Sequence, residues 1–585
     1  MAAGLPSPTY GASRRANDLA ARMYAAFDRT RREYRELTQR ARSSFETRDW
    51  KRLRADSRER LSRYADAVAE GEREALDLLG DAVADRLLWV GAKAVYRGLI
   101  ADRPDRELAE TFFNGVTRRL FATVGVDDYV EFVAPELELP DPASSLRRYE
   151  GDGDALVRLV DRWLEDAPFT VRWANRRVDA HLVADRVKLE LSQIGVTEDV
   201  SAIEVLTPVF FRGTGAYLVG RLEVGGRRVP LALALRMMFR GIAVDAVLST
   251  ERELSILFSF TRSYFHVDAE RPSEVVAFLK ELLPEKPTAE IYISIGQPKQ
   301  GKTELYRALV AHLGGTEERF EHAAGTPGLV MVVFTMPGLD WVLKVIRDRM
   351  PIQKSVSAAH VKGRYKWVYD RDRAGRLVDA QPFEHLVFPR DRFHPALLEE
   401  LLDRCGQSVR LRGPDRVELD LAYVQRRLTP LDLYVRQAGD AEAAAALMDY
   451  AQAIKDLAAS NIFPGDLLLK NFGVTKRGRV ACYDYDELVE LTEMRFRRMP
   501  EPDDDDDEMR AEPFFAVGPR DVFPEEFLRF LAIPARLRSH LAYHCSEIFT
   551  PAFWRQTQEE IEAGKIVEFA PYEPVDRLID PSDRF

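Results

Sequence analysis

The sequence predicts an α+β protein in which a mostly helical N-terminal domain precedes a C-terminal domain of mixed strands and helices. Its 585 residues, 46% hydrophobic and 31% charged, are enough for two to four globular domains. No proline occurs between Pro8 and Pro104, and this stretch is rich in Ala, Leu, Arg and Glu, which favour amphipathic helices. After about residue 200, apolar runs separated by glycine turns indicate strands.

The later part of the N-terminal domain is expected to contain a small set of strands. Residues 215–236 form a predicted hairpin that turns at Gly225-Gly226, and residues 241–249 form a further strand. A helix is expected at 272–283. The next segment, "EIYISI" at 290–295, alternates between apolar and polar residues and predicts another strand.

A second domain is expected after the glycine pair at 314–315. We place the boundary near 310–315, which gives domains 1–312 and 313–585. The new domain opens with "LVMVVFTMPGLDWVLKVI", which predicts two strands joined by a turn at Pro337-Gly338.

Helices and one more strand complete the C-terminal prediction. Helical patterns occur around 395–404 and 441–459, and "RVACYDYDEL" at 479–488 contains a short strand. The acidic run Asp503–Asp507 has prolines nearby and is expected to be a solvated loop.

Composition and charge restrict the class of protein. The net charge of -11 provides no global basic field, so we expect no nucleic-acid partner. The cysteines Cys405, Cys482 and Cys545 are too few and too scattered for a disulfide framework or a zinc site, which suits a reducing cytosol. The N-terminus has no apolar core of the signal-peptide type, and "LLWVGAKAVYRGLI" is interrupted by Lys93 and Arg97. We therefore expect a cytoplasmic protein with no membrane partner.

One candidate nucleotide site is the segment "GQPKQGKTELYR". It fits the phosphate-loop pattern G-x-x-x-x-G-K-[ST] at Gly296, Gly301, Lys302 and Thr303. A predicted strand precedes it and a helical pattern follows, as this motif requires. However, Pro298 lacks an amide proton, and no convincing apolar strand ending in Asp follows to supply the usual metal ligand.

A second candidate site lies in "NIFPGDLLLKNFGV" and the strand after it. Asp466 and Asn471 have the D-x-x-x-x-N spacing of a protein-kinase catalytic loop, and Lys470 lies beside them. Asp484 follows at the end of a strand, where kinases place a metal-binding Asp. Upstream, "WVLKVI" places Lys344 between apolar neighbours, like the lysine that holds the phosphates of ATP. Each feature alone is weak, but their order favours a kinase-like ATP site.

Other features of this second site are consistent with an unusual kinase. "AAGTPGLVMVVF" is a small-residue loop that opens a strand, where kinases cover the phosphates. Pro464-Gly465 stands where His-Arg would precede the catalytic Asp, and Asp-Tyr-Asp stands where Asp-Phe-Gly would be.

Several long segments together resemble one family, the bifunctional isocitrate dehydrogenase kinase/phosphatases of bacteria. The segments are "NIFPGDLLLKNFGVTKRGRVACYDYDEL", "VMVVFTMPGLDWVLKVIRDR", "SAAHVKGRY", "FFRGTGAYLVGRL" and "GKTELYR". The resemblance implies a mostly helical regulatory domain followed by a bilobal protein-kinase-like domain. It also implies an enzyme that phosphorylates a serine of isocitrate dehydrogenase with ATP and Mg²⁺, removes that phosphate and hydrolyses ATP. This controls the branch between the tricarboxylic acid cycle and the glyoxylate bypass.

The resemblance assigns residues to these activities. Lys344 falls on the family's nucleotide lysine. The kinase spacing itself assigns Asp466 as the catalytic Asp, and Asn471 and Asp484 as the metal ligands. Asp379 falls on an Asp that the phosphatase activity needs. The nucleotide loop falls on Ala323, Ala324, Gly325, Thr326, Pro327, Gly328 and Leu329.

The family is regulated by AMP, and "GKTELYR" lies at its domain junction. We therefore expect Lys299 and Lys302 to bind the AMP phosphate at a helix N-terminus. Two alternatives stay open: a P-loop ATPase or nucleotide switch that uses Gly296–Thr303, and a non-catalytic pseudokinase scaffold. The expected partner is isocitrate dehydrogenase, and the sequence leaves a homodimer open.

Overall fold

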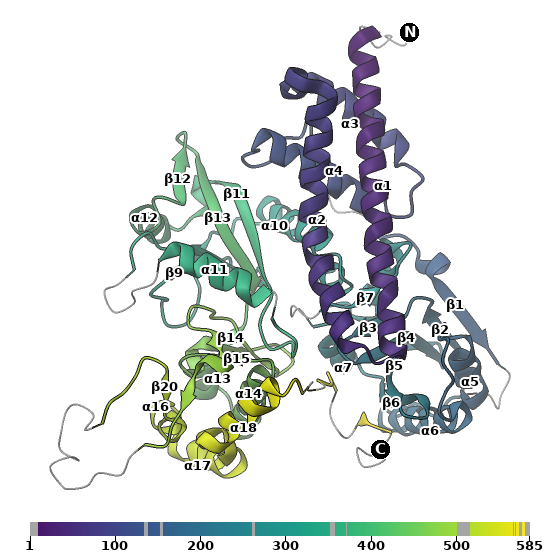
Figure 1. Cartoon of the computed structure of the whole chain (residues 1–585), viewed down its shortest axis with the longest axis vertical. Coiled ribbons are helices and arrows are strands. Elements are labelled where there is room, and N and C mark those ends of the chain that lie inside the picture. Colours follow the sequence, from purple (N-terminus) through teal and green to yellow (C-terminus); the bar gives the residue numbers. More distant parts are fainter. Residues whose placement is uncertain are drawn as a thin grey trace. The chain divides into compact units, whose positions relative to one another are not determined.

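The computed structural model describes residues 10–133, 139–151, 156–259, 264–350, 357–369, 371–499, 515–565, 567, 569–572 and 576–578. The chain forms two compact units (Figure 1). The first comprises the chain up to Ser259, Tyr264–Thr316 and the residues from Ala570 onward, and the second comprises mainly Glu317–Phe569. The division at 316/317 lies shortly after the 312/313 boundary expected from the sequence.

The first unit begins with long helices that pack along their length. In Figure 1, α1 and α2 are the purple helices that lie side by side. Leu19, Met23 and Phe27 recur every four residues on α1 and share a buried core with Trp89 of α3 and Phe112 of α4. The helices of this unit are α1 (Tyr10–Glu46), α2 (Trp50–Leu79), α3 (Arg86–Leu99), α4 (Arg106–Phe121), α5 (Leu156–Asp166), α6 (Arg176–Gln193), α7 (Glu251–Leu257), α8 (Pro272–Leu282), α9 (Thr288–Ser294) and α10 (Pro298–Gly315). None of the helices in the described ranges is both long and apolar enough to span a bilayer.

An antiparallel sheet forms the rest of the first unit, with β1-β2-β4-β3-β7 along one path and β5 and β6 continuing from β4. Leu218 and Leu222 of β4 belong to a core with α5 and α6, whereas Tyr217 and Val219 belong to a core with α8 and α9. Because both faces are covered, the strands read as continuous apolar runs. The strands are β1 (Leu146–Glu150), β2 (Val200–Leu206), β3 (Phe210–Arg212), β4 (Gly215–Val224), β5 (Arg227–Met238), β6 (Gly241–Leu248) and β7 (His266–Val267). The hairpin at Gly225-Gly226 is confirmed.

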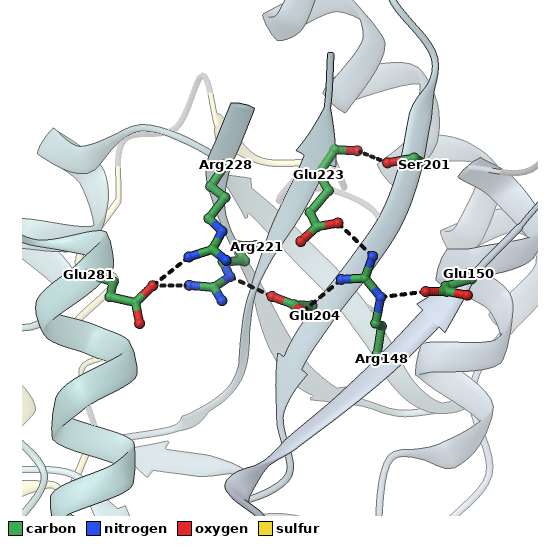
Figure 2. A network of polar contacts seen from close by, with 8 residues as sticks. All are labelled: Arg148, Glu150, Ser201, Glu204, Arg221, Glu223, Arg228 and Glu281. Carbon is green, nitrogen blue, oxygen red and sulfur yellow. Dashed lines mark hydrogen bonds and ion pairs between the residues drawn. The ribbon is translucent and has the colours of Figure 1, made fainter. Parts of the chain in front are cut away.

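A network of ion pairs crosses one edge of this sheet (Figure 2). Arg148 of β1 contacts Glu204 of β2 at 2.7 Å and Glu223 of β4 at 2.6 Å. The buried Arg221 contacts Glu204 at 2.7 Å and Glu281 of α8 at 2.5 Å. Although burial alone would raise it, the two guanidinium groups hold the pKa of Glu204 below its usual value. The network therefore ties three strands and a helix together.

The predicted strand at 290–295 is wrong, because this segment is the helix α9. Every residue from Ala289 to Ser294 is buried, so the alternation of apolar and polar residues does not mark one exposed face. Ile291 and Tyr292 pack into the core between α9 and the sheet. Burial of the whole segment in the tertiary structure decides that it is a helix. The alternation of apolar and polar residues in the sequence cannot reveal such burial.

The second unit contains a sheet part and a mostly helical part, both visible in Figure 1. The sheet has the order β11-β13-β10-β9-β8, with β12 paired to β13. β9 and β10 form the expected hairpin around Pro337-Gly338. The elements are β8 (Glu321–His322), β9 (Met331–Thr335), β10 (Trp341–Ile346), α11 (Ala358–Tyr369), β11 (Ala380–Pro389), α12 (Pro395–Arg404), β12 (Val409–Arg412) and β13 (Arg416–Arg426).

The helical part follows, built around α14 with Leu447, Ile454 and Leu457 in its core. The helices expected around 395–404 and 441–459 are confirmed, whereas Asp503–Asp507 lies outside the described residues. The elements are β14 (Thr429–Pro430), α13 (Leu431–Gln437), α14 (Asp440–Ala459), β15 (Ile462–Phe463), β16 (Phe472–Val474), β17 (Val480–Cys482), β18 (Val489–Glu490), β19 (Arg495–Phe496), β20 (Asp521–Val522), α16 (Phe527–Phe530), α17 (Ala535–His544) and α18 (Pro551–Glu562).

The end of the chain returns to the first unit. The Tyr572 hydroxyl donates to Asp245 of β6 at 2.5 Å, and the amide of Leu578 donates to the Asp245 carbonyl at 2.7 Å. Arg577 forms a bridge with Ala246. The C-terminal segment therefore covers part of β6, although it follows the second unit in sequence.

Candidate active site

One loop and one hairpin bring together three of the predicted site residues. β16 pairs with β17, and the amide of Tyr483 donates to the carbonyl of Asn471 at 3.1 Å. This ladder places Asn471 opposite Tyr483, and Asp484 is the next residue. The Asn471 side-chain amide donates to the Asp466 carboxylate. Asp466, Asn471 and Asp484 are therefore neighbours in space.

Helix α14 fixes the loop that carries Asp466. The Tyr450 hydroxyl of α14 donates to the carbonyl of Leu467, and the Tyr450 ring meets Phe472 edge to face at 4.9 Å. Gly465 adopts a φ of 76°, and a Cβ there would lie 2.6 Å from the carbonyl oxygen of Glu487. Glycine at this position thus allows the loop to approach the segment after Asp484 closely.

Lys344 projects from β10 towards the same hairpin. Its ammonium group donates to the carbonyl of Tyr483 at 2.8 Å and lies 5.0 Å from the centre of the Tyr483 ring. Burial lowers the pKa of Lys344, and the carboxylates of Asp484 and Asp486 oppose that shift. The lysine and the two carboxylates therefore share one electrostatic environment.

The small-residue loop at 323–329 joins β8 to β9. Residues 324–329 are exposed. Gly325 has a φ of 115°, and a Cβ there would lie 3.1 Å from Pro430 of β14. Pro430 pairs with Gly473 of β16, close to Asn471. Through β14, the loop lies near β16, the strand that directly follows Asn471.

Asp379 also lies beside this hairpin. The amide of the preceding Val378 donates to the carbonyl of Cys482 at 3.0 Å. Asp379 is buried, and its carboxylate accepts from the side-chain amide of Gln381 on β11. The fold thus places Asp379 next to the segment that carries Asp484, although more than a hundred residues separate the two in sequence.

Arg376 anchors the segment before Asp379 to the helical part. Its guanidinium donates to both carboxylate oxygens of Asp449 at 2.9 Å and to Asp456 at 2.7 Å, both on α14. It also donates to the carbonyl of Val480 in β17 at 2.9 Å. Although burial alone would raise it, Arg376 holds the pKa of Asp449 below its usual value. This fork geometry fixes the segment to both α14 and β17.

Sequence reasoning did not single out Arg376, Gln381, Gln425 or Tyr485. The Tyr485 hydroxyl donates to the carbonyl of Val378. Gln425 of β13 donates to the Tyr485 hydroxyl at 3.1 Å. The one available signal was Tyr485 in the Asp-Tyr-Asp segment, where kinases have Phe. The other three are ordinary polar residues in sequence, and only the fold brings them to the site.

The phosphate-loop pattern at 296–303 has a different structure from the one its sequence suggests. Gly301, Lys302 and Thr303 lie inside α10, and a helix precedes them in place of a strand. A Cβ on Gly301 would lie 2.4 Å from Cγ1 of Ile293 and 2.6 Å from the carbonyl of Ala289. Gly301 therefore permits close packing of α9 on α10, and the segment lacks the strand–loop–helix structure of a P-loop, so the P-loop alternative is not favoured.

The expected AMP residues lie in the first turns of α10. Lys299 has its ammonium group 5.5 Å from the centre of the Tyr64 ring. Thr303 contacts Thr111 of α4 at 3.2 Å through their hydroxyl groups. Both Lys299 and Lys302 are partly exposed. The two lysines thus share a helix start that packs against α4.

Asn471 and Asp484, the two expected metal ligands, each carry a side-chain oxygen, which is the ligand atom that Mg²⁺ prefers, so these residue types fit the metal. A separate cluster of His385, Glu418 and Asp420 also has the donor types for a metal. There, however, the Arg410 guanidinium already contacts Glu418 at 3.2 Å and Asp420 at 3.3 Å. A cation would have to displace that guanidinium.

A strand lysine, a small-residue loop, an Asp–Asn loop and a following hairpin Asp define a protein-kinase-like phosphotransferase. Models of two domains match the chain: the kinase domain of isocitrate dehydrogenase kinase/phosphatase over residues 318–574, and its regulatory domain over residues 20–317. The chain belongs to the isocitrate dehydrogenase kinase/phosphatase family.

Curated relatives agree over nearly the whole chain. A protein from Anaeromyxobacter sp. (strain Fw109-5) is 46% identical over 567 residues, covering 96% of this chain and 97% of its own. One from Anaeromyxobacter dehalogenans (strain 2CP-C) is 45% identical, covering 95% and 96%. One from Xanthomonas campestris pv. campestris (strain 8004) is 42% identical, covering 97% and 98%. All three carry the name isocitrate dehydrogenase kinase/phosphatase.

Proposed function

We propose that this enzyme phosphorylates a serine of isocitrate dehydrogenase with ATP, which inactivates the dehydrogenase, and that it also removes that phosphate. The enzyme thereby controls the branch between the tricarboxylic acid cycle and the glyoxylate bypass, and it hydrolyses ATP as a side reaction. The observation that carries this proposal is the convergence of Lys344, Asp466, Asn471 and Asp484 on one hairpin.

In the kinase direction, each of these residues has one task. Asp466 accepts the proton of the attacking serine hydroxyl and orients it. Lys344 holds the phosphates of ATP. Asn471 and Asp484 hold Mg²⁺, which offsets the charge of the triphosphate when bound. Ala323, Ala324, Gly325, Thr326, Pro327, Gly328 and Leu329 form the loop over the phosphates.

In the phosphatase direction, Asp379 adds a carboxylate that phosphorylation does not need. The backbone of the preceding Val378 bonds to Cys482 of β17, and from there the Asp379 carboxylate orients the group that attacks the phosphoserine. We expect Asp379→Asn to lose phosphatase activity and to retain substantial kinase activity. An equal loss of both activities would contradict this division of roles.

Regulation by AMP belongs to the first unit in this proposal. Residues 1–312 act as the regulatory domain and residues 313–585 as the catalytic domain. Lys299 and Lys302, in the first turns of α10, bind the AMP phosphate. AMP binding favours the phosphatase by stabilising one of two arrangements of the enzyme. We expect Lys299→Ala to weaken the AMP response.

The partner in this proposal is isocitrate dehydrogenase in the cytoplasm. The described cysteines Cys405, Cys482 and Cys545 are all free and buried, as a reducing compartment allows. The sequence leaves a homodimer open, and light scattering tests it directly. A mass equal to one chain would exclude the dimer.

Radiolabelled ATP and purified isocitrate dehydrogenase test the function in one experiment. We expect label on a serine of the dehydrogenase, loss of dehydrogenase activity, and release of the label after ATP is replaced by ADP and AMP. Asp466→Asn is the matched inactive control. Free phosphate without labelled dehydrogenase would identify an ATPase instead, and no turnover at all would identify a scaffold.

A further inference from the structure

The Tyr485 hydroxyl lies in a buried hydrogen-bond triangle between the two segments that carry Asp379 and Asp484. Tyr485 is fully buried, and its hydroxyl donates to the carbonyl of Val378. The side-chain amide of Gln425 donates to that hydroxyl at 3.1 Å and approaches the same carbonyl at 3.3 Å. Gln425 is buried as well. A polar cluster of this kind fixes its members because each lost bond leaves a buried group unpaired.

This triangle connects the neighbours of two proposed site carboxylates. Tyr485 directly follows Asp484, and Val378 directly precedes Asp379. The amide of Val378 is held by the Cys482 carbonyl at 3.0 Å, so the carbonyl and the amide of Val378 are both fixed to the 482–485 segment. The Tyr485 hydroxyl therefore holds the backbone directly next to Asp379.

Aromatic packing fixes the Tyr485 ring independently of its hydroxyl. The ring lies 4.9 Å from Tyr365 of α11, and Tyr365 stacks on Tyr423 of β13 at 4.0 Å. The Tyr365 hydroxyl points to Met331 at 3.2 Å and takes no part in the triangle. Removing the Tyr485 hydroxyl should therefore leave the ring packing in place and change only the link to Val378.

We propose that Tyr485 is a positioning residue whose hydroxyl holds Asp379 in register with Asp484, and that dephosphorylation depends on this link more than phosphorylation does. The inference rests on the proposed function, because it assumes that Asp379 serves the phosphatase direction. Its physical reason is geometric. Asp466 and Asn471 belong to the loop and hairpin that α14 supports. Arg376 ties the start of the Asp379 segment to α14 and β17, but the bonds of Val378 are the ones directly next to Asp379.

The test compares Tyr485→Phe with Tyr365→Phe, a matched loss of a buried hydroxyl in the same aromatic cluster. Kinase and phosphatase kcat and KM are measured on the same preparations, together with the melting temperature. We expect Tyr485→Phe to lower the ratio of phosphatase kcat to kinase kcat by about tenfold, because the net free energy of one buried hydrogen bond changes a rate by about that factor. Tyr365→Phe should leave the ratio within a factor of about two.

A second variant keeps the proposal testable if Tyr485→Phe folds poorly. Gln425→Met conserves volume and removes the other donor of the triangle, so it should shift the ratio in the same direction. The double variant should lower the ratio of phosphatase to kinase kcat by less than the product of the two single effects, since Tyr485 and Gln425 both bond to the Val378 carbonyl. An unchanged ratio, or an equal loss of both activities, would overturn the role of Tyr485. Failure of the proposed function would show itself differently, as absence of kinase activity in the unmodified enzyme.

Discussion

At the scale of single residues, the contact between Asn471 and Asp466 is central to the site. The amide of Asn471 donates to the carboxylate that we assign as the base, and the Asn471 carbonyl also holds Tyr483, the residue before Asp484. The proposed base and the proposed metal ligands are thus parts of one hydrogen-bonded unit.

Removing the base and removing a metal ligand should therefore differ in their response to Mg²⁺. We expect Asp466→Asn to lower kinase kcat by roughly 10² or more at any Mg²⁺ concentration, because the base and its orientation are lost. Asp484→Asn should instead raise the Mg²⁺ concentration needed for half-maximal rate. Titrating Mg²⁺ in both variants measures this, with the exposed Asp440→Asn as the control. Recovery of Asp466→Asn in excess Mg²⁺ would show that the roles are reversed.

Glu107 of α4 is a buried residue with a pH-dependent effect on stability. Burial raises the pKa of Glu107 to about 7, because its charged form is poorly solvated. The folded state therefore binds more protons than the unfolded state between about pH 4.5 and 7, and stability falls as pH rises through this range. Glu107→Gln should be more stable than the unmodified protein at pH 8 by roughly 1 to 3 kcal/mol, and about equal near pH 4.5.

Urea unfolding of Glu107→Gln at several pH values measures this effect. The exposed Glu59→Gln on α2 serves as the control and should show no such pH trend. A stability difference for Glu107→Gln that is constant with pH would exclude a titrating Glu107.

At the scale of elements, the ion-pair network around Arg148 and Arg221 in the first unit contains both buried and exposed ion pairs, whose contributions to stability should differ. The Arg221 side chain is 4% exposed and joins Glu204 of β2 to Glu281 of α8, whereas the Arg228 side chain is 56% exposed and pairs with Glu281 (Figure 2). Removing the buried member of an ion pair leaves the other charge buried and uncompensated, which destabilises the fold. Removing the exposed member costs little, because water then solvates the charge that remains.

We therefore expect Arg221→Met to lower the unfolding free energy of the first unit by roughly 2 to 4 kcal/mol. Arg228→Met should cost less than about 1 kcal/mol. Hydrogen exchange of the β2 and β4 amides measures both effects in the full chain. Similar costs for the two variants would mean that burial does not govern the strength of this network.

At the scale of the whole molecule, two compact units are covalently connected at 316/317 and again where the chain returns to β6. Each unit has its own buried core, so unfolding is not expected to be a single two-state transition. Ligands that bind one unit should stabilise that unit first.

A non-hydrolysable ATP analogue with Mg²⁺ should therefore stabilise the second unit. At 100 times its dissociation constant, the ligand contributes about 2.7 kcal/mol. Hydrogen exchange by mass spectrometry should show protection in 331–346 and 466–484. Lys344→Met should lose that protection, and the exposed Lys476→Met should keep it. Protection confined to 288–315 would instead place the nucleotide at the α9–α10 segment.

Much of the site could be predicted from local sequence. Short-range periodicity predicts the strand with Lys344 and the helix before Asp466, and fixed distances along the chain single out Asp466, Asn471 and Asp484. The same local reasoning failed at α9, where full burial removes the difference between two faces, and at Gly301, which permits helix packing.

The sequence by itself thus determined the family, the order of the two units and the residue types of the kinase-like site. Only the tertiary structure decided how Asp379 reaches the hairpin, through Val378, Tyr485 and Gln425. Only the tertiary structure likewise shows that Arg577, near the end of the chain, pairs with Ala246 of β6. Such contacts join residues far apart in sequence through single hydrogen bonds. Neither residue type nor periodicity encodes those partners, because burial and backbone geometry select them only after the chain has folded.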